Sequence, residues 1–263
     1  MAKHRRRWNQ SVYEKYITEG RGQGEGQEYK PWIRVQDFAS RGIVSRVYSH
    51  KTGRVHHLLS NNELHYFYLA EWSEKVIDIR EQFPLSDLET AMNVAASAGI
   101  AYPTDNVSGF PYVMTCDFVL TTTGGLKART IKQVSELANT RVIEKLEIER
   151  RYWERLGVDW KLVTDRDIDT PKARAIEWAR QNGNGTSICK DGSVLAEAVK
   201  RFETNESTID AAGSLEYDFH YPKGVGLLIL KQLIQTKQIS ADKPLFVGSV
   251  DLGVLSRATR EQI

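Results

Sequence analysis

The hydrophobic positions of the first two thirds of the chain repeat with the periods of both strands and helices. Alternation with a period of two predicts strands within residues 45–59, 75–85, 112–134 and 159–165. A period near 3.6 and helix-start signals predict helices at residues 10–19, 60–72, 139–157 and 170–178. Residues 86–111 are expected to be mostly loop. This order of elements predicts an α/β fold with a mixed sheet flanked by helices.

The pattern breaks at the polar stretch QNGNGTSICKDGS, residues 181–193. Beyond it the sequence predicts helices beginning near Ser193, covering Ser207–Leu215 and lying within residues 224–239, followed by a strand at KPLFVGSV, residues 243–250. Three helices and a short β element follow the order of a winged helix. We therefore expect two domains, residues 1–168 and a smaller winged-helix domain at residues 169–263.

Composition is that of an ordinary globular protein, with 263 residues, 41% hydrophobic and 27% charged. No apolar run approaches the roughly 18 to 20 residues that cross a bilayer, and the basic start has no apolar segment behind it. A cytoplasmic location is expected. Cys116 and Cys189 are too few and too isolated to predict disulfides or a zinc site, so they are expected to be buried thiols.

Positive charge is concentrated near the start of the chain. Residues 1–60 hold 12 Lys and Arg against 5 Asp and Glu, a net charge of +7, while the remaining 203 residues carry −5. Such asymmetry is typical of a surface that contacts phosphate backbones, and a solvated basic arm is the alternative. The candidate nucleic-acid contacts are Arg5, Arg6, Arg7, Lys51 and Arg54.

A lysine, Lys132, stands in one of the strand-patterned runs, where a cationic side chain is unusual. If Gly124-Gly125 forms a two-residue hairpin turn, Asp117 faces Lys132 directly across the ladder, and Thr130 lies on the same face. An acid opposite an x-x-Lys resembles the core of metal-dependent nucleases of the restriction-endonuclease type. In such sites the carboxylate holds Mg²⁺ and the lysine orients or stabilises the attacking water.

Glu63 is a second candidate acid. Ser60 and Glu63 form the S-x-x-E pattern of a capping box at the start of a helix that leads into the sheet, from which Glu63 would complete a two-ion site. The residues also permit simpler interpretations. Asp117 and Lys132 would then be a cross-strand ion pair worth less than about 1 kcal/mol, and Glu63 only a cap.

Several longer strings resemble the TnsA family, the endonuclease subunit of heteromeric Tn-type transposases, over about residues 19–178. They are EGRGQGEGQEYKPW, YSHKTGRVHHLLSNNE, DIREQFPL, CDF, EKLEIERRYW and WKLVTDRDI. The resemblance implies a restriction-endonuclease-like nuclease domain in which Glu63 and Asp117 bind metal and Lys132 is the catalytic lysine. It also implies that Glu149 is a further active-site acid.

One residue departs from the family pattern. The family carries Gln at the position of Thr130, and a threonine hydroxyl is a poor Mg²⁺ ligand. We therefore expect the backbone carbonyl of Ile131, or a water, to supply that contact. The implied cofactor is Mg²⁺, as two ions, for which Mn²⁺ can substitute in assays.

The implied activity is Mg²⁺-dependent hydrolysis of double-stranded DNA at the 5′ ends of a mobile element in the bacterial cytoplasm, at the nucleoid. The implied partners are a TnsB-like transposase, which cuts and joins the 3′ ends, and a TnsC-like AAA+ ATPase, so that transposition is cut-and-paste. The C-terminal domain resembles a DNA-binding and regulator-docking module. The alternatives are a stand-alone nuclease of the same fold and a non-catalytic DNA-binding adaptor.

Overall fold

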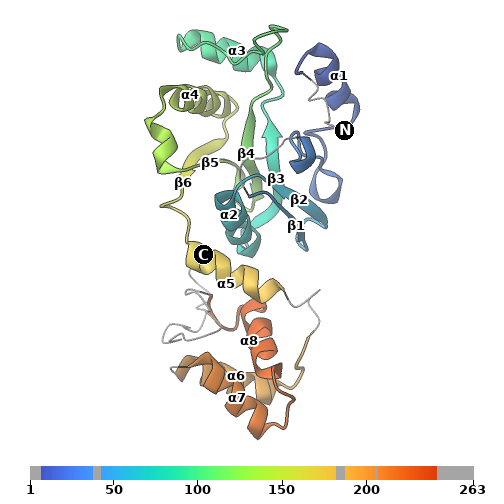
Figure 1. Cartoon of the computed structure of the whole chain (residues 1–263), viewed down its shortest axis with the longest axis vertical. Helices are drawn as coiled ribbons and strands as arrows, with labels where there is room; N and C mark the ends of the chain where they lie inside the picture. The colour runs from blue at the N-terminus through green and yellow to red at the C-terminus, as the bar shows by residue number, and fades with distance from the viewer. Residues whose placement is uncertain (1–6, 38–42, 182–186, 205–206, 242–263) are drawn as a thin grey trace. The chain divides into compact units, whose positions relative to one another are not determined.

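The computed structural model describes residues 7–37, 43–181, 187–204 and 207–241. The chain forms two compact units, Met1–Ile168 and Asp169–Ile263 (Figure 1). The first unit contains all the strands of the described residues, and every regular element described in the second unit is a helix. The predicted α/β class, a mixed sheet with helices followed by a helical C-terminal part, is thereby confirmed.

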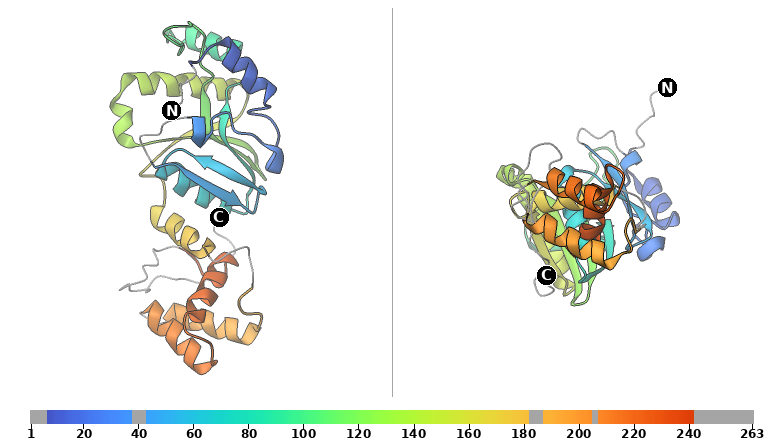
Figure 2. Two further views of the ribbon diagram at one scale, coloured as in Figure 1. Left: turned by 45° about the vertical axis from the view of Figure 1, so that its right-hand side comes forward. Right: turned by 90° about the horizontal axis from the view of Figure 1, so that it is seen from below.

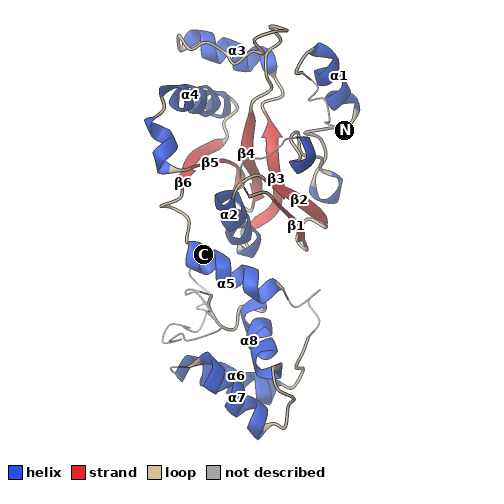
Figure 3. Ribbon diagram, viewed as in Figure 1, coloured by secondary structure: helices blue, strands red, loops and turns tan. Residues whose placement is uncertain are grey.

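The central sheet of the first unit has four strands in the spatial order β3-β4-β5-β6, drawn in red in Figure 3. Both β3–β4 and β4–β5 are antiparallel pairs, whereas β5 and β6 are parallel, so the sheet is mixed as the sequence predicts. The strands are β3 (Val76–Pro84), β4 (Thr115–Thr122), β5 (Gly125–Lys132) and β6 (Asp159–Thr164).

A separate hairpin and four helices complete this unit. The hairpin appears as the pair of blue arrows in Figure 2 and consists of β1 (Ser45–Ser49) and β2 (Arg54–Leu58). The helices are α1 (Gln10–Thr18), α2 (Asn61–Trp72), α3 (Leu88–Ser97) and α4 (Thr140–Arg155). Short 3₁₀ turns lie at η1 (Gly26–Glu28), η2 (Val35–Asp37) and η3 (Val134–Ala138).

Helix α3 was not predicted from the sequence, in which residues 86–111 were expected to be rich in loop. Asp87 caps the helix by accepting a hydrogen bond from Thr90 N at 2.9 Å. The buried residues of α3 are Ala91, Val94 and Ala95, at helical spacing. Its apolar face is hard to detect in the sequence because it is built largely from alanine, which contributes little to a hydrophobic pattern.

Helices α2 and α4 cover opposite faces of the sheet. Phe118 contacts Tyr66 of α2, with ring centroids 5.3 Å apart. Its neighbour Val119 belongs to an apolar cluster with Tyr152 and Trp153 of α4. Because successive strand residues point to opposite faces, the two helices sandwich β4. Both free thiols, Cys116 and Cys189, are buried as expected.

The β4–β5 turn differs from the predicted one. Thr122 pairs with Gly125, so the two-residue loop is Thr123-Gly124, one residue earlier than expected. The Thr122 hydroxyl closes this loop: its Oγ1 donates to Gly125 O at 2.8 Å and accepts from Gly124 N at 3.2 Å. The predicted direct pairing of Asp117 with Lys132 is therefore wrong. Pairing shifts by two residues, which leaves every side chain on its expected face.

Four helices connected by loops make up the described residues of the second unit. Its helices are α5 (Thr170–Arg180), α6 (Gly192–Thr204), α7 (Thr208–Asp218) and α8 (Val225–Gln235). Helix α8 contacts the other three, with Ile229, Leu230, Leu233 and Ile234 fully buried. Its apolar sequence thus serves packing. The strand predicted at residues 243–250 lies outside the described residues, so the winged helix stays a prediction.

No helix in the described ranges is long and apolar enough to span a membrane.

Candidate active site

Glu63 enters the site from the first turn of α2. Ser60 caps the helix, and its Oγ accepts from Glu63 N at 3.1 Å, as the S-x-x-E pattern predicts. The Glu63 carboxylate makes different contacts from those of a capping box: Oε1 accepts from Ser60 Oγ at 2.9 Å and Oε2 accepts from Leu59 N at 2.9 Å. These bonds hold a buried carboxylate at the end of the helix nearest the sheet.

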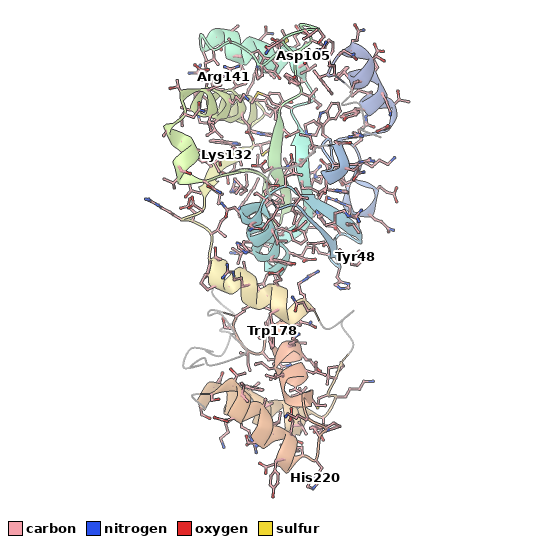
Figure 4. The ribbon with its side chains drawn as sticks, in the orientation of Figure 1. Tyr48, Asp105, Lys132, Arg141, Trp178 and His220 are labelled. Carbon is pink, nitrogen blue, oxygen red and sulfur yellow. The ribbon has the colours of Figure 1, made fainter. Side chains whose placement is uncertain are left out.

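Asp117 and Lys132 meet at the neighbouring ends of β4 and β5. Lys132 Nζ lies 3.4 Å from Asp117 Oδ2 and 2.8 Å from Ile131 O, at the end of β5 (Figure 4). Asp117 Oδ2 also accepts from Ile131 N at 2.7 Å. The lysine in the strand is thus explained: it places an ammonium beside a buried carboxylate.

Gln82, which was not among the residues expected from the sequence, joins the two acids. Its Nε2 lies 3.2 Å from Glu63 Oε2 and 3.4 Å from Asp117 Oδ1. Gln82 has φ of +48° near the end of β3, a conformation that costs a non-glycine residue about 1–3 kcal/mol. Polar residues inside a buried strand were the available signal, since β3 reads VIDIREQFP and Gln82 is only 2% exposed.

The acids offer oxygen ligands suited to Mg²⁺. One oxygen from Glu63 and one from Asp117 converge on the same N–H₂ group, so both point to a single position where positive charge is favoured. Within the described ranges, no group of three or more His, Cys, Asp or Glu side chains is arranged to hold a metal. A cation held here would take its remaining ligands from backbone carbonyls, water or DNA phosphate. The carboxylates of Glu63 and Asp117 therefore fit a Mg²⁺ ion.

Thr130 and Glu149 form a second buried pair. The Thr130 hydroxyl donates to Glu149 Oε1, and Trp160 Nε1 lies 3.2 Å from both of these oxygens. Glu149 comes from α4 and is 3% exposed. The Thr130 hydroxyl is thus engaged by Glu149 rather than by the acids that Gln82 bridges. Trp160 was not anticipated from the sequence.

Burial and neighbouring charge shift the pKa values of these groups. Burial, followed by the charge of Asp117, raises the pKa of Glu63 to about 7. Burial likewise raises the pKa of Glu149 to about 7, against the hydrogen bond from Thr130. Burial lowers the pKa of Lys132, but the charges of Asp117 and Glu149 outweigh it and the net shift is upward. The site therefore holds a charged lysine and favours cations near its acids.

Two comparisons with known proteins give a match. Residues 73–165 match the family described as TnsA-like endonuclease N terminal. The transposon Tn7 transposition protein TnsA of Escherichia coli is 42% identical over 181 residues, which are 68% of this chain. This chain is a TnsA-like protein. The match covers 65% of the length of the Escherichia coli protein. The family match in this TnsA-like protein includes Asp117 and Lys132, while Glu63 precedes it.

Two of the expected nucleic-acid contacts of the TnsA-like protein, Lys51 and Arg54, make hydrogen bonds within the protein. Arg54 is buried, and its Nη2 donates to Glu81 Oε2 at 2.6 Å and to Ile79 O at 2.7 Å. Lys51 Nζ donates to two backbone carbonyls, those of Ser73 and Val76, each at 2.5 Å. These bonds argue against phosphate contacts by Lys51 and Arg54. Arg7 is exposed, whereas Arg5 and Arg6 lie outside the described residues.

Arg54 belongs to a buried ionic cluster that fixes the hairpin to β3. Glu81 is fully buried and accepts from Arg54, from His56 Nδ1 at 2.7 Å and from His57 N at 3.1 Å. Burial raises the pKa of Glu81, but His56 and Arg54 outweigh that effect and hold the pKa well below its usual value. On the hairpin, the exposed side chains include Arg46 and Tyr48. Tyr48 is labelled in Figure 4.

Proposed function

We propose that this TnsA-like protein is a Mg²⁺-dependent DNA endonuclease that hydrolyses the 5′ ends of a mobile element. The observation that carries the proposal is the convergence of Glu63 and Asp117 on one cation-favouring position, with the Lys132 ammonium 3.4 Å from Asp117. The endonuclease family match over residues 73–165 supports it. A restriction-endonuclease-like fold for the first unit is part of the same proposal.

Each residue has a distinct role in this proposal. Glu63 and Asp117 would hold Mg²⁺, together with the Ile131 carbonyl. A bound divalent cation polarises a phosphoryl oxygen and makes bound water more acidic. The Lys132 ammonium orients the attacking water and offsets the negative charge that develops on the phosphate. Thr130 and Glu149 have a supporting role and do not bind the cation, because the Thr130 hydroxyl is already bonded to the Glu149 carboxylate.

The proposed partners rest on the resemblance to the TnsA family and on the Tn7 relative. The Escherichia coli relative is a Tn7 transposition protein, and we infer that this chain acts in a comparable complex. We propose a TnsB-like transposase for the 3′ ends and a TnsC-like AAA+ ATPase as regulator, on double-stranded DNA in the bacterial cytoplasm. The C-terminal unit, proposed as a winged helix, would bind DNA or the regulator.

A strand-specific cleavage assay tests this proposal. Element-end DNA labelled separately on each strand is incubated with Mg²⁺, the TnsB-like and TnsC-like partners and this protein. The proposal expects 5′-strand cuts that require this protein, together with 3′-strand cuts that do not require its Asp117. Cutting of unrelated DNA without partners would favour the stand-alone nuclease instead.

The presence of Thr130, where the family has Gln, favours one second candidate, a non-catalytic DNA-binding adaptor with a decayed site. Calorimetric titration with Mn²⁺ separates the two functions. The nuclease proposal expects binding that Asp117→Asn removes. If the protein is a non-catalytic adaptor, neither wild type nor Asp117→Asn should give a heat of Mn²⁺ binding.

A further inference from the structure

The carboxamide of Gln82 occupies the position between the two candidate metal-binding acids. Nε2 has two N–H donors, and the two carboxylate oxygens lie 3.2 Å and 3.4 Å from it. One side chain from β3 thus connects a helix residue, Glu63, with a residue of β4, Asp117. Without a donor between them, two buried carboxylates this close would repel each other.

The orientation of the amide is fixed by a third partner. The Thr115 hydroxyl donates to Gln82 Oε1 at 3.3 Å, so the oxygen end faces a donor and the nitrogen end faces two acceptors. The reversed amide would set an oxygen against two carboxylates. The hydrogen-bond network therefore specifies which end points to the acids.

The backbone conformation at Gln82 directs its side chain toward the two acids. The paired residues on either side are Glu81 with Phe118 and Phe83 with Cys116, which leaves Gln82 opposite Asp117 at an interruption of the ladder. Gln82 has φ of +48°, and its carbonyl accepts from Trp32 N at 3.2 Å. A left-handed residue is retained in a strand only when its surroundings enforce it, and such positions cluster at functional sites.

We propose that Gln82 is a positioning residue and a placeholder for the divalent cation. In the ion-free protein its amide holds the Glu63 and Asp117 carboxylates at the spacing of a shared ligand position, and the amide leaves that position when a cation binds. The second half of this statement rests on the proposed function. The consequence is an acid pair that is organised before the cation arrives, at the cost of weaker cation binding.

The Gln82→Met variant tests both halves, because methionine matches the length of glutamine but has no N–H donors. In EDTA, the melting temperature is expected to fall by several degrees. In calorimetry, Mn²⁺ is expected to bind roughly tenfold more tightly than to wild type, since hydrogen bonds to charged groups no longer compete with it. Unchanged Mn²⁺ binding would show that the amide does not compete with the cation, and weaker binding would show that the glutamine is itself a ligand. Either result would overturn the placeholder role.

Two further variants keep the test decisive. Thr115→Val leaves Gln82 intact but removes the hydroxyl that orients it, and a smaller increase in Mn²⁺ affinity is expected. Gln181→Met, at an exposed glutamine that follows α5, should change neither the melting temperature nor the affinity. Should Gln82→Met fail to fold, Thr115→Val decides alone, and wild-type affinity in that variant would refute the proposal.

Failure of the proposed function is recognisable separately. If wild type binds no Mn²⁺, the cation proposal fails, and the positioning role is judged from melting temperatures in EDTA. Gln82→Met, Asp117→Asn and the double variant then form a cycle. The positioning role expects the Gln82→Met shift to become smaller when Asp117 is already neutral. Additive shifts would refute it.

Discussion

Lys132 Nζ lies 3.4 Å from Asp117 Oδ2, although the β4–β5 register puts Thr130, not Lys132, across from Asp117. The lysine reaches diagonally along the face of the sheet, a distance that long side chains span. Its ammonium also donates a hydrogen bond to the carbonyl oxygen of the preceding residue, Ile131, at 2.8 Å. What brings the acid and the lysine together is therefore their shared face, which a shift of two residues preserves.

Glu63 should make the stability of the metal-free protein depend on pH. Its pKa in the folded protein is raised to about 7, so the folded state binds the proton more tightly than the unfolded state does. This stability is complete below the unfolded pKa, near 4.5, and is lost as pH rises through about 7. In EDTA, wild type should lose up to about 3 kcal/mol more than Glu63→Gln between about pH 5 and pH 8.

Urea denaturation of both proteins at the two pH values provides this measurement. Glu89→Gln, at an exposed glutamate of α3, is the control and should follow wild type. An identical pH dependence in wild type and Glu63→Gln would show that burial and Asp117 do not perturb Glu63.

Glu81 should be essential for stability rather than for chemistry. Glu81→Gln leaves the buried Arg54 guanidinium without a charged partner and weakens the bonds to His56 and His57 N. Breaking a buried ion pair from one side typically costs about 3–5 kcal/mol. The free energy of unfolding at pH 7, from urea denaturation, should fall by that amount. A loss under about 1 kcal/mol would mean that the hairpin is held by other contacts.

The basic N-terminal arm should contribute to DNA affinity through its charge. Replacing Arg5, Arg6 and Arg7 with Gln should flatten the plot of log affinity against log salt by about 0.9 for each phosphate that the arm no longer neutralises. Lys51→Met should leave the slope unchanged, because that ammonium is bonded to Ser73 O and Val76 O. Equal slopes for wild type and the triple variant would remove the arm from the DNA interface.

Thr130 should support Glu149 without binding the cation. Thr130→Val removes the hydroxyl that donates to Glu149 Oε1, while Trp160 Nε1 remains 3.2 Å from that oxygen. The expected decrease in stability is about 1–3 kcal/mol, with Mn²⁺ affinity in calorimetry within about twofold of wild type. Abolished Mn²⁺ binding in a folded Thr130→Val protein would make the hydroxyl a ligand and contradict this assignment.

Most elements of the fold were predictable because their patterns are local. The Ser60 cap, the amphipathic α4 and the strand alternation of β4 and β5 each depend on neighbouring residues only. The turn at Thr123-Gly124 was mispredicted because a side chain, the Thr122 hydroxyl, decided between two adjacent glycine-containing turns.

The site was predictable only in part. Glu63, Asp117 and Lys132 were predicted from a helix-start pattern, turn geometry and a family resemblance. In the structure Gln82 links Glu63 to Asp117, and Lys132 lies beside Asp117. Gln82 could not be found, because its role depends on a left-handed backbone that no local pattern signals in a strand. The internal partner of Arg54, which was predicted to contact DNA, could not be found either, because Glu81 is distant in sequence and fully buried.

The central claim is that Asp117 and Lys132 together form a cleavage centre, and 5′-strand cutting within the assembled complex tests it most directly. Wild type, Asp117→Asn, Lys132→Met and the control Glu89→Gln are compared with the same partners, Mg²⁺ and labelled element ends. The account predicts that the two site variants lose 5′-strand cutting by at least about 100-fold while 3′-strand cutting continues, and that the control retains both. Wild-type rates of 5′-strand cutting by folded Asp117→Asn and Lys132→Met would contradict it.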